Sequence, residues 1–304
     1  MQWYEISISI IAMIALFVHS MDHFANNLKK RVGGRMDRLF TSVSNNRFKG
    51  FLFGFVATGI VQSSSVVISI LVSFVDTGLI SFSGSLPVLL GSNLGTTVTA
   101  WLVTLDINFL GTVLIVIGFI VGYFPERIRL FSKPLFYLGL ILFSLQLLDQ
   151  SLDPLKESEK MIHFLGYASH PISGILIGIL ATAITQSSSV TVGLAIILTA
   201  QNVIQLESAI GIIVGSNIGT TSTAFLASIK LNQTAKKTAL LNLFFNLFGA
   251  LIYLPFHHIF SETIRSMNTD AAIQVALAHL FFNLGIGILI LPFTNHISSY
   301  FERK

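Results

Sequence analysis

The chain alternates between long apolar runs and short polar segments, a pattern typical of a protein that crosses a membrane several times. A helix needs roughly 20 mainly apolar residues to cross a bilayer. Runs that approach or exceed this length occupy residues 5–24, 85–104, 108–124, 134–149, 206–228, 238–256 and 271–293. We therefore expect an all-α polytopic membrane protein with about seven transmembrane helices.

One polar pattern occurs twice, at an offset of 124 residues. A Gln-Ser-Ser-Ser run stands at Gln62–Ser65 and again at Gln186–Ser189. Each is followed by a Gly-Ser-Asn-x-Gly-Thr-Thr motif, at Gly91–Thr97 and at Gly215–Thr221. The identities between the two copies fall mostly on polar or small residues. A duplicated core that only needed packing would not keep its serines and amides, so the repeat indicates a functional site.

The glycines and the Asn-x-Gly-Thr-Thr run of the second motif favour local unwinding of a helix. We therefore expect the spans 85–104 and 206–228 to be broken. The alternative is that glycine and serine only allow close helix packing, as we expect for the GxxxG pairs Gly50/Gly54, Gly174/Gly178 and Gly118/Gly122.

The segments 50–76 and 171–200 are too polar at their centres for ordinary spans. Each is either a broken helix that crosses once or a re-entrant helical hairpin with the Gln-Ser-Ser-Ser run at its tip. Loop charge favours the hairpins. With two hairpins, the basic loops lie on one face and the near-neutral loops on the other, the N-terminus outside and the C-terminus inside. The basic loops are 25–49, 125–133 and 229–237, and the near-neutral loops are 105–107, 150–169 and 257–270.

Three crossings separate the two hairpins, so the second copy enters from the opposite face. Inverted-topology repeats with discontinuous helices are typical of alternating-access transporters, with the site at the repeat interface. We expect one membrane domain over residues 1–304. Its parts are the first span and basic cytoplasmic loop (1–49), repeat 1 (50–124), a connecting span (134–149), repeat 2 (170–256) and the last span (271–293).

Composition supports this class and narrows the chemistry. Of 304 residues, 53% are hydrophobic and 11% charged, against roughly 25% charged in soluble domains. We expect a multi-pass protein of the cell membrane, plasma or inner, with the lipid bilayer as a partner. The net charge of +4 lies mostly on loop lysine and arginine, which orientation explains without a nucleic acid.

Enzymatic and cofactor chemistry find no support in the residues. The chain has no cysteine, no nucleotide-binding P-loop, no catalytic triad pattern and no paired intramembrane carboxylates. Its histidines lie in no metal-ligand spacing, so we expect no transition-metal site. We therefore expect a protein that is not an enzyme, holds no cofactor and does not act as a primary pump.

The Gln-Ser-Ser-Ser runs have the chemistry of an anion site. Serine is a favoured N-cap, and the start of a helix offers free N–H groups and a positive dipole end. Two such tips meeting near the membrane midplane would surround a tetrahedral oxyanion with donors. The candidate anion-binding residues are Gln62, Ser63, Ser64, Ser65, Gln186, Ser187, Ser188 and Ser189.

The second motifs have the chemistry of a cation site. Carbonyl, amide and hydroxyl oxygens suit alkali cations at broken helices. No core arginine or lysine balances the anion, so Na⁺ would serve as counter-charge as well as energy source. The candidate Na⁺ ligands are Thr58, Asn93, Thr96, Thr97, Thr182, Asn217, Thr220 and Thr221.

These motifs resemble those of the type II sodium/phosphate cotransporter family, over residues 50–300. The resemblance implies Na⁺-driven uptake of inorganic phosphate. It implies that Gln62–Ser65 and Gln186–Ser189 line both sites, which adds Gln62, Ser65, Gln186 and Ser189 to the Na⁺ ligands. The family's His-x-x-Phe-Asn pattern stands at His279–Asn283. The soluble PhoU-type helical domain that many bacterial members carry after the last span is not matched, so we expect that regulation to be absent or supplied in trans.

Further polar groups inside the last two spans are Asn246, Asn283 and His279. They are either interhelical hydrogen-bonding groups or, for His279, a proton-titrating group. In the span before the last, Asn242 occupies the position of the histidine.

The sequence thus predicts a Na⁺-coupled symporter of inorganic phosphate that works by alternating access. The alternatives are a phosphate channel or exporter, an H⁺-coupled oxyanion carrier and, from another class, a non-transporting membrane sensor or scaffold. A sensor would need an output domain, which the pattern lacks. A homo-oligomer is compatible with every one of these functions.

Overall fold

The computed structural model describes residues 4, 8–21, 23–24, 26–27, 46–104, 109–156, 170–267 and 269–302. All regular secondary structure in these residues is helical, which confirms the predicted all-α class. An N-terminal helix includes residues Ile8–Met21. The basic stretch 28–45 of the loop 25–49, and the loop 105–107, lie outside the described residues.

The helices of the two halves follow in the same order. The first half has α2 (Arg47–Val61), α3 (Ser64–Asp76), α4 (Phe82–Gly95), α5 (Thr97–Val103), α6 (Leu110–Val121), α7 (Glu126–Arg129) and α8 (Ser132–Lys156). The second half has α10 (Pro171–Thr185), α11 (Ser188–Ala200), α12 (Leu206–Ser228), α13 (Gln233–Arg265), α14 (Ala271–Ile290), the 3₁₀ turn η2 (Leu291–Phe293) and α15 (Thr294–Glu302).

Four helical stretches of the described chain are long and apolar enough to cross a membrane. They are Phe82–Val103, Leu206–Ser228, Gln233–Arg265 and Ala271–Glu302. This agrees with a polytopic membrane protein. The total of seven spans and the orientation of the termini stay predictions, because helix length and composition do not determine topology.

The predicted break in the span 206–228 is wrong. Helix α12 runs without interruption through Gly215–Thr221. In the first copy one residue, Thr96, separates α4 from α5. The backbone angles of Thr96 are themselves helical, so the helix is barely interrupted there. The hydroxyls in this part of α12 donate to carbonyls three or four residues earlier, as Thr220 does to Ser216 and Thr221 to Ile218. The expected unwound carbonyls are therefore engaged within the helix.

Close helix packing explains these glycines. A Cβ on Gly91 would lie 1.8 Å from the Phe51 carbonyl oxygen of α2, and one on Gly215 would lie 2.0 Å from the Ile175 oxygen of α10. The predicted packing role of Gly54 and Gly178 is confirmed by the same pairs of helices, with Cβ distances of 2.2 and 2.1 Å to the Val88 and Ile212 oxygens. Small residues let backbones approach in this way, as is common between membrane helices.

Two helices extend further than the apolar runs predicted. Helix α8 continues to Lys156, into the segment 150–169 expected to be a linker, whose remaining residues 157–169 lie outside the described ones. Helix α13 continues past Pro255 to Arg265, into the expected loop 257–270. Hydropathy reports where apolar residues end, whereas a helix continues as long as its backbone bonds do.

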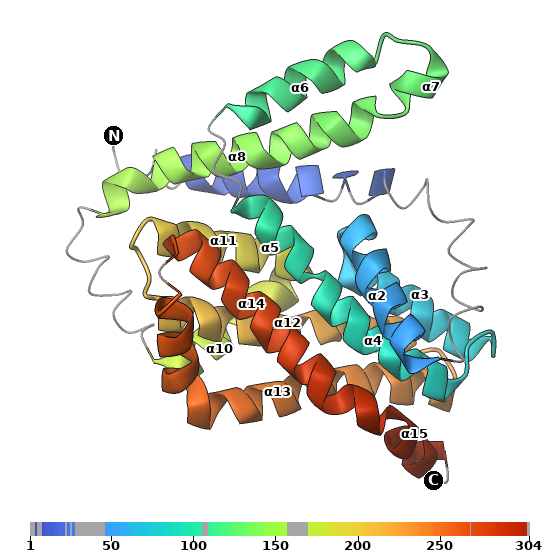
Figure 1. The fold of residues 1–304 in the computed structure, drawn as a ribbon. Helices are drawn as coiled ribbons and strands as arrows, with labels where there is room; N and C mark the ends of the chain where they lie inside the picture. Colours follow the sequence, from blue (N-terminus) through green and yellow to red (C-terminus); the bar gives the residue numbers. More distant parts are fainter. Residues whose placement is uncertain are drawn as a thin grey trace.

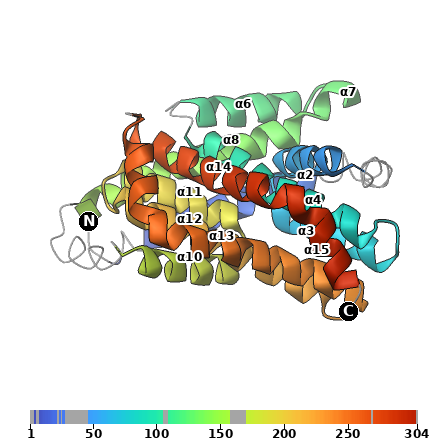
Figure 2. The ribbon, with the colours of Figure 1, turned by 60° about the horizontal axis from the view of Figure 1, so that its bottom comes forward.

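Helices α2–α5 and α10–α14 form the body of the molecule, whereas α6, α7 and α8 form an arm above it (Figure 1). Helix α12 packs against both α10 and α13 (Figure 2). The main core gathers fully buried side chains of α3, α4, α12 and α14, among them Leu71, Leu86, Ile213 and Val275. The N-terminal helix packs Phe17 against Ile141 of α8 in a smaller cluster.

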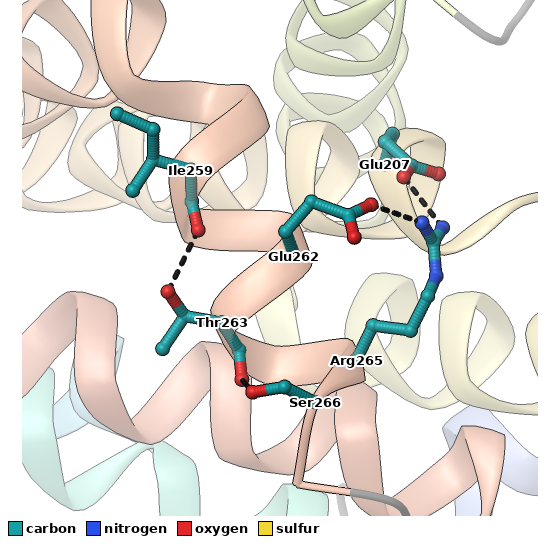
Figure 3. A network of polar contacts seen from close by, with 6 residues as sticks. All are labelled: Glu207, Ile259, Glu262, Thr263, Arg265 and Ser266. Carbon is teal, nitrogen blue, oxygen red and sulfur yellow. Dashed lines mark hydrogen bonds and ion pairs between the residues drawn. The ribbon is translucent and has the colours of Figure 1, made fainter.

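Polar contacts tie α13 to both halves at its two ends. At its start, Asn232 donates its backbone N–H to the Asp76 carboxylate at the end of α3 (2.7 Å). At its end, Arg265 bridges Glu262 and Glu207 (Figure 3), and its guanidinium lies 2.6 Å from the Glu207 carboxylate. Glu207 lies in the first turn of α12, where the helix dipole favours an acidic side chain.

The packing role of the glycines predicts a position-dependent effect of one methyl group. Gly215→Ala should destabilise the protein by about 1–3 kcal/mol, because the added carbon meets backbone that cannot rotate away. Gly285→Ala in α14 is the matched control, since no atom lies within 4 Å of its added Cβ, and it should be neutral or slightly stabilising. Melting temperatures in detergent measure both. Equal melting temperatures would contradict the packing account.

Candidate functional site

Each Gln-Ser-Ser-Ser run forms a junction between two helices. Gln62 ends α2 and Gln186 ends α10, with φ of 56° and 52°. Positive φ is uncommon outside glycine. Among the described residues only one other non-glycine residue, Asn202, has it, so two of the three cases are the matched glutamines. A left-handed residue is a common way to end a helix, and non-glycine residues held in this region cluster at functional sites.

The serine after each glutamine begins the returning helix. Ser63 and Ser187 have extended backbones and occupy the N-cap positions of α3 and α11. The first backbone bonds of these helices are donated by Val67 and Thr191, to the carbonyls of Ser63 and Ser187. The Ser63 hydroxyl accepts a hydrogen bond from the Val66 N–H (3.4 Å), and α11 has no such cap. The other N–H groups in the first turn of each helix have no partner among the described residues, and they accompany a positive dipole end.

Both junctions open on the same pocket, which has a volume of about 90 Å³. All eight residues predicted to bind the anion line it: Gln62, Ser63, Ser64, Ser65, Gln186, Ser187, Ser188 and Ser189. Segments 124 residues apart in the chain are thus brought together. Val66, Met21 and Asn26 complete the lining.

The N-terminal helix was not part of the predicted site. Met21 and Asn26 come to the pocket from it. In the sequence, only Asn26 could have indicated a role in the site, because it is a polar amide just after an apolar run. The packing of that helix against distant parts of the chain brings it to the pocket, and local pattern does not encode such packing.

The two copies differ in how their glutamines are held. The Gln62 side chain is buried, donates to the Gly59 carbonyl and accepts a hydrogen bond from the Thr99 hydroxyl (2.9 Å). Gln186 is exposed and bonds to no other described residue through its side chain. The counterpart of Thr99 in the second copy, Thr223, donates instead to the Thr220 carbonyl of its own helix. The site therefore has one fixed amide and one free amide.

The pocket has the size and polarity for a small ion. Ligand pockets for drug-sized molecules are roughly 300–1,000 Å³, several times larger. Its lining residues present amides, hydroxyls and a few apolar atoms and carry no formal charge. Among the described residues, no group of three or more histidine, aspartate or glutamate side chains could hold a metal ion.

The other candidate Na⁺ ligands do not line this pocket. Thr58 shares a hydrogen bond of 2.6 Å with Ser92, and Thr182 donates to Thr191 over 2.8 Å. Thr96, like Thr220 and Thr221, donates to a carbonyl of its own helix, and Thr97 is buried. A hydroxyl that donates its proton keeps lone pairs that can face a cation.

Asn93 and Asn217 join the repeat helices to the last two spans. Asn93 donates to the Asn242 side chain (3.1 Å), and Asn217 donates to the Asn283 side chain (3.0 Å). Interhelical hydrogen bonding of Asn283 is thereby found, whereas Asn246 bonds to Asn242 within its own helix.

His279 is fully buried, and neither ring nitrogen has a partner among the described residues. The predicted interhelical bonding is thus not found for this side chain.

Comparison with known proteins relates nearly the whole chain to one family. The family model described as Na⁺/Pi-cotransporter matches residues 16–150 and 153–289. The Bacillus subtilis protein named "Uncharacterized protein YqeW" is 31% identical over 274 residues, which are 89% of each chain. No solved structure matches.

Two further relatives have functional names. The Escherichia coli protein named "Putative inorganic phosphate export protein YjbB" is 29% identical over 87% of this chain, which spans about half (49%) of that relative's length. The mouse protein named "Sodium-dependent phosphate transport protein 2A" is 36% identical over 97 residues, 31% of this chain and 15% of the mouse protein.

The hydrogen bond that fixes the Gln62 amide can be tested, and the corresponding residue of the second repeat provides the control. Thr99→Val should cost about 1–3 kcal/mol of stability, because it leaves the buried Gln62 oxygen without its donor. Thr223→Val removes only a bond within one helix and should cost well under half as much. Unfolding of the two variants by heat or denaturant measures the difference, and equal losses would show that the Thr99–Gln62 bond does not fix the junction.

Proposed function

The chain belongs to the Na⁺/Pi-cotransporter family, and we propose that it is a Na⁺-coupled symporter of inorganic phosphate in the plasma or inner membrane. The observation that carries the proposal is the meeting of both Gln-Ser-Ser-Ser junctions at one small pocket. A single junction could be explained as a local turn between two helices. Two matching junctions at one pocket support a binding site formed by both repeats.

Phosphate fits the donors of this pocket. The hydroxyls of Ser64 and Ser188 and the free N–H groups at the starts of α3 and α11 would donate to its oxygens. A tetrahedral oxyanion accepts hydrogen bonds in every direction, so donors converging from two helices suit it better than they suit a planar or an organic anion. Two positive helix ends supply partial charge without arginine or lysine.

Sodium would supply the charge that the protein lacks. Burying an anion without full compensation is costly, and the described lining carries no cationic side chain. Gln62, Ser65, Gln186 and Ser189 would share Na⁺ with the phosphate. Oxygens of Thr58, Asn93, Thr96, Thr97, Thr182, Asn217, Thr220 and Thr221 would hold further ions behind the pocket. Each ion would then favour phosphate binding, and phosphate would favour the ion, which couples the two.

Transport would follow from the inverted arrangement of the repeats. Two re-entrant hairpins from opposite membrane faces would bring their tips to the midplane. Rearrangement of one repeat against the other would then open the site to each side in turn. The equal order and equal packing of α2–α4 and α10–α12 support this mechanism.

Export of phosphate is the second candidate function. The name of the Escherichia coli relative favours it, and that protein aligns with most of this chain. An exporter or channel would use the same pocket, but its phosphate flux would be indifferent to an inward Na⁺ gradient. Coupling and direction therefore separate the two candidates.

We expect Ser64→Ala and Ser188→Ala each to lower phosphate affinity about ten- to a hundredfold, because each removes a hydrogen bond to a charged ligand. Uptake of ³²P-phosphate by purified protein in liposomes measures this. Ser85→Ala is the control, since Ser85 is equally buried and its hydroxyl donates only to the Phe82 carbonyl. Wild-type uptake in both tip variants would sink the site assignment.

Replacement of external Na⁺ by choline should abolish phosphate uptake in the same liposomes, because the anion would lose its counter-charge. Vesicles preloaded with phosphate measure the opposite direction. Flux that persists in choline and follows the phosphate gradient alone would favour the exporter or channel. Flux that follows a pH gradient instead would favour an H⁺-coupled carrier.

A further inference from the structure

Helices α6, α7 and α8 form the arm seen in Figure 1. Two adjoining hollows lie at the tip of this arm, where α7 joins α6 to α8. One, of about 670 Å³, is lined by the basic side chains of Arg127, Arg129 and Lys133. The other, of about 350 Å³, is lined by aromatic rings that include Phe119, Tyr123 and Phe136. Gly122, Ser132 and Lys133 line both, so the basic hollow continues into the aromatic one.

The basic hollow has an excess of positive charge. Glu126 is its one acidic lining residue, and it pairs with Arg129 at 3.4 Å. Arg127 and Lys133 form no ion pair with a described residue. Two cations thus stay available to a ligand.

Packing between α6 and α8 holds the hollows in shape. A Cβ on Gly118 would lie 2.4 Å from the Phe136 backbone nitrogen, so the two helices are in backbone contact beside the aromatic hollow. The Ser132 hydroxyl donates to the Gly118 carbonyl over 2.7 Å and fixes the start of α8 to the end of α6. The aromatic hollow is therefore built by packing between α6 and α8, and the basic hollow adjoins it at the short helix α7 that connects them.

The surroundings of the tip are those of a membrane surface. Tyr123 is 78% exposed and Phe119 is 59% exposed, and their rings are in edge contact. Aromatic residues beside basic residues are typical of the level of the lipid headgroups. Basic pockets between helices on the cytoplasmic side, where the sequence places residues 125–133, bind anionic headgroups.

We propose that the tip of the arm binds an anionic phospholipid. Arg127 and Lys133 contact its phosphodiester, and one acyl chain lies in the aromatic hollow along Phe119 and Phe136. The continuity of the two hollows carries this assignment, because a phospholipid joins an anion to a hydrocarbon chain within one molecule. A free phosphate would fill only the basic hollow.

The test is native mass spectrometry of the full chain in detergent, titrated with dioleoyl phosphatidylglycerol or with dioleoyl phosphatidylcholine. Wild-type protein should retain phosphatidylglycerol selectively. R127Q/K133Q should weaken its retention roughly 25-fold, at about fivefold for each basic residue near an anionic surface. K230Q/K236Q is the control, because it removes the same charge from another basic segment, and it should leave retention unchanged.

Competition by short-chain phosphatidylglycerol and by inorganic phosphate distinguishes binding of the whole lipid from binding of its headgroup alone. Both should compete poorly, and competition by phosphate as strong as by the long-chain lipid would overturn the proposal in favour of a free anion. Equal loss in R127Q/K133Q and the control would overturn it in favour of general surface charge. If R127Q/K133Q fails to fold, the single variants R127Q and K133Q replace it, and each should weaken retention about fivefold. Wild-type retention is also titrated with NaCl, since a charge contact with the headgroup weakens with salt whereas an acyl-chain contact does not. Retention independent of salt would overturn the proposal.

Discussion

The structure depends on one constraint, which is that a backbone N–H group away from water needs an acceptor. Helices such as α2, α4 and α13 meet it in part at their starts with a side-chain cap. In α3 the Ser63 hydroxyl caps only the Val66 N–H, and α11 has no side-chain cap, so most N–H groups of both first turns stay without a partner among the described residues. Facing both starts toward one pocket collects the unmet donors where a ligand with several acceptors can meet them together.

Local polarity in the sequence was sufficient to predict these junctions. Four polar residues in the middle of an apolar run do not fit an ordinary membrane span. Because the same four residues recur at a fixed offset, chance and helix packing alone are poor explanations for them. The helices around them end within a few residues of the predicted segments 50–76 and 171–200. The meeting of the two runs was also predicted, because transporters built from inverted repeats have their site at the repeat interface.

The glycines of the second motif show why the rest could not be predicted. Glycine weakens an isolated helix, and it also allows two helices to pack closely. A broken helix and a closely packed helix can therefore have the same glycine pattern in the sequence. What decides at Gly215 is the Ile175 carbonyl of another helix, 2.0 Å from where a side chain would begin. The partners of Asn93 and Asn217 likewise lie on distant helices, at Asn242 and Asn283. Such long-range pairs leave no trace in local pattern.

The composition of the pocket has a consequence for its response to acidity. Its lining is made of glutamine, serine, asparagine, valine and methionine, none of which gains or loses a proton in the physiological range. A bound ligand would thus be the group that can gain or lose a proton in this pocket, since no described lining side chain does so. A phosphate bound there would bring its own proton or leave it behind, so the pH dependence of binding would report the ionisation of the substrate.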